Sequence, residues 1–501
     1  MGLARIGKGI RYLAILNLIQ ILAILIFYHI LTNTLTQAEI GLSATLTFVY
    51  TVLTSFSPLA LPLAGAKFIA EFLGRREEEK AAATARSIVR LVLISSTITA
   101  LLFHLILVIV ASRTGFSDVL SFSFISIAAV IASLKLTYLS FIQGLQLFDR
   151  LSITNLSTTI VSYIVGIILT PNFRVLGFAM GIIVGDCIGL MLAIVFHYGY
   201  LPKTTSFHNS RELLRLSFPV YIMQIVTIIS DWADRILFLA ASLNFALLGV
   251  YDLAVKSAAS LLIISHYFET IIIPILASSY GNSGNQGMSA ILQKGVRWLG
   301  VIYFPVAFGL AAISNTVMIV LYGSTYAEGG ILLALLAVSS IFTAFYVLLG
   351  AALKSIGKTR AFIKISLVSL VVDAVLVIYL TPPFGLLGPS IGRISAAILA
   401  LILIYNEVRR FIEVEVDWSG FWKSLFASII SAATLIVIDN LSIDAILVKL
   451  SVGIGVGVLS YITALMLLKT LQSEDFHMLR QITPMLIRVI DFIQRISGVR
   501  D

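Results

Sequence analysis

Long apolar runs dominate this sequence and restrict it to one class of fold. A helix that crosses a membrane needs about 20 mostly apolar residues, and the chain contains fourteen candidate runs of roughly that length or more. Runs this long exceed what a transmembrane barrel strand needs, so helices are the spanning structure they predict. The candidate spans are, in chain order, 12–32, 41–65, 87–111, 118–143, 152–170, 175–197, 214–242, 247–277, 296–322, 330–353, 362–381, 385–406, 421–439 and 443–469.

Composition excludes the main alternatives to a membrane protein. Hydrophobic residues make up 59% of the chain and charged residues only 12%, whereas soluble domains carry about 25% charged residues. This excludes a soluble enzyme, and the high hydrophobicity excludes a disordered chain. A single cysteine, Cys187, and six histidines without metal-binding spacing indicate neither a disulfide framework nor a zincin-type site.

The distribution of cationic residues predicts the orientation in the membrane. With the N-terminus placed in the cytoplasm, 27 of the 34 Lys and Arg residues fall on the cytoplasmic side, as the positive-inside rule requires. We therefore expect a multi-pass protein of the plasma membrane with both termini in the cytoplasm. The cationic residues behind the net charge of +9 thus lie mainly at the cytoplasmic face of the membrane. We expect no nucleic-acid partner.

The connections between the spans are short, so no loop is long enough to hold a catalytic domain. PNFR at 171 and TPPFG at 381 predict two especially tight turns, and Pro58 predicts a kink within the second span. After residue 470 comes the sequence HMLRQITPMLIRVIDFIQRI. Its helical spacing places apolar residues on one face of a helix and arginines on the other. It predicts an amphipathic helix on the inner membrane surface.

Three short matches in chain order indicate an internal repeat. Gly41 and Gly249 occupy similar segments 208 residues apart, the ends of spans 4 and 10 match at the same offset, and Gly177 matches Gly388 at an offset of 211. Six spans per copy place both copies in the same orientation, as in transporters built from parallel repeats. The predicted divisions are an N-lobe (1–198), a C-lobe (199–410), two extra spans (411–470) and the cytoplasmic tail (471–501).

Charged side chains inside the spans are the candidate functional residues, because charges at membrane depth usually face a bundle interior or a wet cavity. Asp231, Asp234 and Asp373 lie on polar helix faces, Asp373 with Ser369 one turn before it, and hard cations prefer such oxygen donors. Basic side chains would suit an anionic, phosphate-bearing substrate. The substrate-binding candidates are Lys135, Arg235, Lys256, Arg393, Asn17, Gln20 and Gln224.

Structural ion pairing is the alternative explanation for each of these charges. Asp252 and Lys256 are four residues apart in one span, and such i, i+4 pairs usually bind each other. For that pair we favour the structural explanation. For Lys135, Arg235 and Arg393 the sequence leaves both explanations open.

Several motifs, taken together and in order, resemble polysaccharide flippases of the Wzx type. These belong to the multidrug, oligosaccharidyl-lipid and polysaccharide exporter superfamily. The resemblance covers nearly the whole chain and is carried by LTQAEIG at 35, AEFLGRREEEKA at 70, LSFPVYIMQIVTIISDWADR at 216, LLGVYDLAVK at 247 and FGLLGPSIG at 384.

The resemblance implies an all-α polytopic fold with 14 transmembrane helices: two six-helix lobes in a pseudo-twofold parallel repeat and two C-terminal helices. It implies flipping of an isoprenoid-phosphate-linked glycan from the cytoplasmic to the outer leaflet by alternating access, among membrane lipids. Relatives that flip the peptidoglycan lipid precursor carry a sodium site between spans 7, 11 and 12. The residues here on matching helices are Asp234, Asp373, Ser369 and Ser395, with Asp231 nearby.

Two other functions are the alternatives to a flippase. A MATE-type cation-coupled drug exporter would share the fold, although twelve spans and a less cationic cavity would be expected. A membrane glycan ligase or polymerase would need a large outer loop with catalytic charges. We therefore expect a non-enzymatic, monomeric flippase without an organic cofactor, coupled to Na⁺ or H⁺.

Overall fold

The computed structural model describes residues 19–470, apart from 21, 203, 415–416 and 442–444. Within these residues every regular element is a helix. Asn17 and the predicted amphipathic tail at 471–501 lie outside the described residues.

An apolar helix, Leu22–Thr32, precedes the numbered elements. The helices that follow are α2 (Gln37–Phe56), α3 (Leu61–Gly74), α4 (Glu78–Thr114), α5 (Val119–Gly144), α6 (Phe148–His197), α7 (Ser210–Ser242), α8 (Phe245–Ala312), α9 (Ser314–Tyr322), α10 (Gly329–Ser355), α11 (Thr359–Phe384), α12 (Leu387–Val408), α13 (Trp418–Asp439) and α14 (Ile446–Leu467). A 3-10 turn, Ser324–Tyr326, links α9 to α10.

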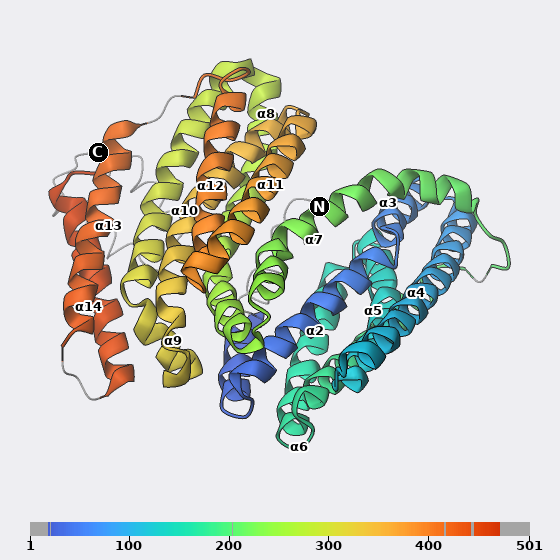
Figure 1. The fold of residues 1–501 in the computed structure, drawn as a ribbon. Coiled ribbons are helices and arrows are strands. Elements are labelled where there is room, and N and C mark those ends of the chain that lie inside the picture. The colour runs from blue at the N-terminus through green and yellow to red at the C-terminus, as the bar shows by residue number, and fades with distance from the viewer. Residues whose placement is uncertain (1–18, 21, 203, 415–416, 442–444, 471–501) are drawn as a thin grey trace. The chain divides into compact units, whose positions relative to one another are not determined.

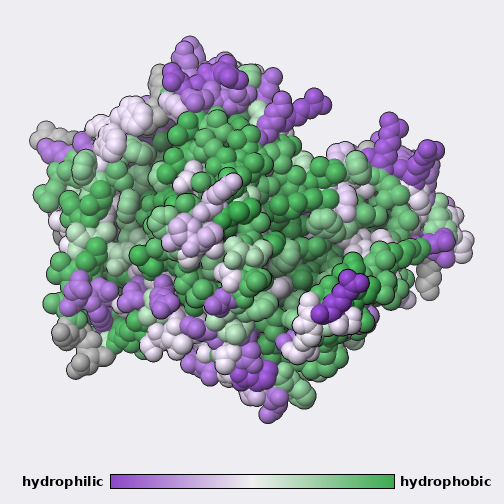
Figure 2. Space-filling view, viewed as in Figure 1, coloured by the Kyte–Doolittle hydropathy of each residue, from purple (hydrophilic) through white to green (hydrophobic). Residues whose placement is uncertain are grey.

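Ten of the described helices are long and apolar enough to cross a membrane. Figure 2 shows hydrophobic residues along the sides of the helices, with hydrophilic residues gathered toward their ends. Two of the ten, α6 with 50 residues and α8 with 68, are longer than one span requires, and each contains a residue with non-helical backbone angles, Arg174 or Gly284. The all-helical membrane fold is thus established, while the number of fourteen spans remains a prediction.

The described chain forms two compact units. The first contains residues up to 239 together with 243–250, and the second contains 240–242 and the chain from 251 onward. Helix α8 therefore begins in the first unit and continues in the second. The lobe and domain boundaries expected from the sequence stay predictions.

In the first unit, α5 packs against both α6 and α4, as Figure 1 shows. The predicted kink at Pro58 separates α2 from α3, where Leu59 and Ala60 adopt left-handed backbone angles. The predicted PNFR turn divides α6 at Arg174. A Cβ on Gly177 would lie 2.6 Å from the carbonyl carbon of Leu169, so a glycine lets the two arms of α6 approach closely.

In the second unit, α12 packs between α10 and α11, and α13 packs against α14 (Figure 1). The TPPFG segment ends α11 at Phe384, and Gly385 then adopts φ 54° and ψ −125°. Arg174 in the first unit has nearly the same angles, φ 53° and ψ −131°. A Cβ on Gly388 would lie 2.7 Å from the carbonyl carbon of Leu380, so the local geometry of the two tight hairpins repeats 211 residues apart.

Candidate functional site

A buried cluster of three polar side chains joins three helices of the first unit. The ammonium of Lys135 on α5 donates a hydrogen bond of 2.6 Å to Asp186 Oδ1 on α6. The hydroxyl of Tyr50 on α2 donates one of 2.8 Å to Asp186 Oδ2. Asp186 is 1% exposed and Lys135 is 9% exposed. Both carboxylate oxygens therefore have a donor, and the lysine charge has a carboxylate partner.

Glycines on α6 make room for this cluster. Gly181, Gly185 and Gly189 recur every four residues, so they form one face of the second arm of α6. A Cβ on Gly185 would lie 2.7 Å from the carbonyl oxygen of Thr158 in the first arm, and one on Gly189 would lie 2.8 Å from Cδ of Lys135. The two arms thus approach backbone to backbone, and the lysine stem lies over Gly189.

Helix α7 carries a second group of predicted residues. Asp234 is fully buried and accepts a 2.8 Å hydrogen bond from the backbone amide of Arg235. The guanidinium of Arg235 lies 3.9 Å from Asp234 Oδ1, donates to the carbonyl of Asp231 at 2.6 Å and covers the ring of Trp232 at 4.5 Å. Gln224, three turns earlier, is half-buried. The structure therefore gathers Asp234 and Arg235 with the backbone of Asp231.

Lys256 and Asp252, one turn apart on α8, form an ion pair in which Asp252 is 1% exposed. This is the arrangement that their i, i+4 spacing favours. Glu269, later in the same helix, receives a 2.6 Å hydrogen bond from Lys354 of α10, and the Lys354 ammonium lies 4.0 Å from the ring centroid of Phe362.

The remaining predicted residues lie on α11 and α12 of the second unit. Asp373 is buried on α11, and a Cβ on Gly392 of α12 would lie 3.4 Å from its Oδ1. The hydroxyl of Ser369 donates to the carbonyl of Ala396 on α12 at 3.1 Å. Ser395 instead donates to the carbonyl of Ile391 in its own helix at 2.8 Å.

Ser369 therefore links α11 to α12 one turn before Asp373, and the cation site expected at these residues stays a prediction. Asp231 and Asp234 belong to the first unit, and Asp373, Ser369 and Ser395 to the second. Across the described residues no three acidic, histidine or cysteine side chains form a metal-binding group. Arg393 is half-buried on α12, and Gln20 is half-buried ahead of the Leu22–Thr32 helix.

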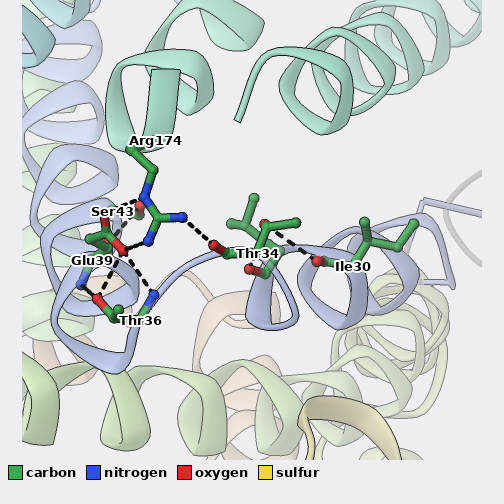
Figure 3. Close-up of polar contacts among 7 residues, drawn as sticks. Ile30, Thr34, Thr36, Glu39, Ser43 and Arg174 are labelled. Carbon is green, nitrogen blue, oxygen red and sulfur yellow. Dashed lines mark hydrogen bonds and ion pairs between the residues drawn. The ribbon is translucent and has the colours of Figure 1, made fainter. Parts of the chain in front are cut away.

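The sequence did not predict another polar cluster of the first unit, which is drawn in Figure 3. Arg174, at the break in α6, donates through Nε to Glu39 Oε1 at 2.7 Å and through Nη1 to the carbonyl of Thr34 at 2.5 Å. A second guanidinium nitrogen also contacts the Glu39 carboxylate. The same carboxylate completes a capping box with Thr36 at the start of α2. Thr followed three residues later by Glu is the sequence signal that could have located one half of this cluster.

Comparison with known proteins identifies the family. A family model described as "Polysaccharide biosynthesis protein" matches residues 6–280, more than half of the chain. The chain belongs to this family. The resemblance to polysaccharide exporters inferred from the sequence is confirmed.

A curated relative extends the comparison. The "Probable low-salt glycan biosynthesis flippase Agl15" of Haloferax volcanii is 21% identical over 282 residues, which span 56% of this chain and 60% of the relative. The match thus covers less than two thirds of that relative's length.

Solved structures share the fold over a larger part of the chain. "Lipid II flippase MurJ, inward closed conformation" matches with a TM-score of 0.72 at 13% identity, covering 91% of this chain and 98% of that one. An inward-facing "multidrug resistance MATE family transporter of the MOP superfamily" matches with a TM-score of 0.64 at 17% identity, covering 78% and 94%. All three proteins carry names of flippases or transporters, in agreement with the expectation of a non-enzymatic protein.

Proposed function

We propose that this chain is a flippase that moves a lipid-linked oligosaccharide from the cytoplasmic to the outer leaflet of the plasma membrane. The observation that carries the proposal is the family match over residues 6–280, together with the glycan flippase among its relatives. Alternating access would expose the glycan path to each side of the membrane in turn. The isoprenoid tail would stay in the bilayer.

The basic residues inside the helices support an anionic substrate. Lys135, Lys256 and Arg235 each lie beside a buried aspartate. A phosphate group is a strong acceptor for such cations, and it would compete with the aspartates for them as the carrier phosphate passes. We therefore propose an isoprenoid-phosphate-linked glycan as substrate.

We also propose that a cation, Na⁺ or H⁺, drives the cycle through Asp373 and Asp234. The support on α11 is the buried Asp373 carboxylate with the hydroxyl of Ser369 one turn away. On α7 it is the fully buried Asp234 carboxylate. Cation binding would neutralise carboxylates whose burial as anions is costly.

The test is translocation of a fluorescent polyprenyl-pyrophosphate-linked oligosaccharide in proteoliposomes, with and without Na⁺ and pH gradients. We expect a gradient to accelerate translocation by the wild type, and we expect no acceleration for Asp234→Ala or Asp373→Ala. Asp439→Asn, at the end of α13, is the control and should respond as the wild type does. Translocation that is equally fast without gradients and in both variants would refute coupling. Transport of cationic drugs with no movement of the glycolipid would instead favour the drug-exporter alternative.

A further inference from the structure

A contact between a cation and an aromatic ring occurs at matching positions in both halves of the sequence repeat. In the second unit the ammonium of Lys358, at the turn between α10 and α11, lies 4.9 Å from the ring centroid of Phe411, shortly after α12. In the first unit the guanidinium of Arg150 lies 5.1 Å from the ring centroid of Tyr200, shortly after α6. The offsets of 208 and 211 found above relate the two contacts. The end of α12 therefore lies beside the turn that precedes α11.

Four further basic residues at or beside these two turns of the second unit have no basic counterpart in the first unit. They are Lys354 and Arg360, which correspond to Gln146 and Ser152, and Arg409 and Arg410, which correspond to Tyr198 and Gly199. The first unit makes the same contact between a cation and a ring without these charges, so the packing of the turns does not require them. Together with Lys358 the four residues form a basic patch of the second unit.

Acidic side chains balance only part of the charge of the basic patch. Arg410 lies 2.8 Å from Glu407, and Lys354 lies 2.6 Å from Glu269. The other three members are exposed, and within the part of the chain that the structure describes they have no ion pair. An excess of positive charge therefore remains on an exposed surface.

Aromatic rings position two further cations of the basic patch. The ammonium of Lys354 lies 4.0 Å from the ring centroid of Phe362, and the guanidinium of Arg409 lies 5.6 Å from the ring centroid of Tyr405. Both rings lie at the ends of predicted spans, 362–381 and 385–406, the depth at which aromatic side chains meet lipid headgroups. The cations beside them are therefore within reach of headgroup phosphates.

An exposed apolar face of α11 continues from the basic patch. Val368, Val371 and Val375 follow Arg360 by 8, 11 and 15 residues, a spacing that places all four on one face of the helix. The three valines are 46–60% exposed. A cationic helix end above an exposed apolar face fits a ligand with an anionic head and apolar tails, whereas a free phosphate would use the cations alone.

We propose that the basic patch binds the headgroup of an anionic phospholipid in the membrane leaflet that the sequence predicts to be cytoplasmic, with the acyl chains along the valine face of α11. Anionic lipids give the cytoplasmic leaflet its negative surface potential. Guanidinium groups donate paired hydrogen bonds to phosphate oxygens, and lysine ammonium groups add point charges. The site lies within the second unit and does not depend on the proposed flippase activity.

Native mass spectrometry of the purified full chain in detergent tests the site, because it counts bound lipids by mass. The probes are phosphatidylglycerol, which is anionic, and phosphatidylcholine, which has no net charge. We expect Arg360→Gln/Arg409→Gln to raise the apparent dissociation constant of phosphatidylglycerol by at least about tenfold, because each basic residue near a lipid surface contributes about fivefold. Binding of phosphatidylcholine should not change, and Arg360→Lys/Arg409→Lys should keep most of the phosphatidylglycerol binding.

Arg75→Gln/Arg76→Gln is the matched control, because it removes two exposed charges from the turn between α3 and α4 in the first unit. It should bind phosphatidylglycerol as the wild type does. Equal weakening in the control and in the patch variant would show that only overall charge matters, and it overturns the proposal, as does unchanged binding in the patch variant. Should the double variant unfold in detergent, Arg360→Gln alone is expected to weaken phosphatidylglycerol binding by about fivefold.

A third probe separates a phospholipid site from a substrate site. If the patch variant loses affinity for a polyprenyl-pyrophosphate-linked oligosaccharide and keeps its affinity for phosphatidylglycerol, the patch serves the proposed substrate and the phospholipid proposal is wrong. Absence of glycolipid translocation by the wild type would refute the flippase proposal alone, because the lipid-binding measurement involves no transport.

Discussion

Gly41 and Gly249 face each other where α2 crosses the first turns of α8. A Cβ on Gly41 would lie 1.8 Å from the carbonyl oxygen of Phe245, and a Cβ on Gly249 would lie 2.5 Å from the carbonyl oxygen of Gln37. Each glycine thus meets the carbonyl four residues before the other glycine. The sequence comparison matched these two positions 208 residues apart, so the crossing is symmetrical in sequence as well as in contact.

The first prediction is that alanine at either glycine destabilises the protein. The added methyl group has to push two helix backbones apart, and overpacking of this kind typically costs about 1–3 kcal/mol. We expect a lower midpoint of thermal unfolding for Gly41→Ala and Gly249→Ala, with the larger loss at Gly41 because its clash is closer.

Gly455→Ala on α14 is the control for helix propensity, because a Cβ there meets nothing within 4 Å. It should leave the midpoint unchanged or raise it. Equal midpoints for all three variants would show that the crossing carries no packing constraint.

The second prediction concerns Arg174, whose backbone angles are nearly those of Gly385. Gly385 is its counterpart in the repeat, and there the residue is a glycine. Such angles cost a residue with a side chain about 1–3 kcal/mol, and the contacts with Glu39 and Thr34 compensate. Arg174→Ala keeps the strain and loses the contacts, whereas Arg174→Gly loses both.

The midpoint of thermal unfolding should therefore be lowest for Arg174→Ala. The midpoint of Arg174→Gly should be higher than that, and it should equal or lie below the wild-type midpoint. Glu39→Gln should lose only part of the stability that the Glu39 contacts provide, because the oxygen of its side-chain amide still accepts one hydrogen bond. If Arg174→Ala proves more stable than Arg174→Gly, the backbone at this turn is not strained.

Features encoded within one or two helical turns could be predicted from the sequence. Apolar length indicated the membrane helices, because only burial in lipid stabilises runs of that kind. Proline and glycine located the breaks at Arg174 and Gly385. The pairing of Asp252 with Lys256 followed from their spacing, since residues four apart lie on the same helix face.

Contacts between distant helices could not be predicted in this way. Lys135 was recognised as a charge inside a span, but its pairing with Asp186 depends on which faces of α5 and α6 meet. Tyr50 carried no signal, because a tyrosine in an apolar run is ordinarily a packing residue. The contact of Arg174 with Glu39 joins residues 135 apart in sequence, and no local pattern encodes it.

The third prediction concerns Leu243, which ends α7 in the left-handed conformation with φ 51° and is 83% exposed. Glycine adopts this conformation without the steric cost that a Cβ imposes. Leu243→Gly should therefore raise the free energy of unfolding by up to about 1 kcal/mol. Leu243→Ala keeps a Cβ and separates this backbone effect from the loss of an exposed apolar side chain. Thermal midpoints that move together in the two variants would contradict the backbone explanation.

The final prediction concerns Asp439, which attaches α13 and α14 to α9. Its Oδ1 accepts a 2.5 Å hydrogen bond from the hydroxyl of Thr316 and lies 3.5 Å from the ammonium of Lys449. A partly exposed ion pair contributes less than about 1 kcal/mol, and a hydrogen bond to a charged group contributes about 1.5–3 kcal/mol. Asp439→Ala should thus lower the unfolding free energy more than Lys449→Met does.

Thr316→Val tests whether the hydroxyl is the main partner of Asp439. If it is, the double variant Thr316→Val/Asp439→Ala should be little less stable than Asp439→Ala alone, because both substitutions remove the same bond. Thermal unfolding of the four proteins in one detergent measures this coupling. Fully additive losses would mean that Asp439 stabilises the attachment mainly through Lys449, and then Lys449→Met should account for most of the effect of Asp439→Ala.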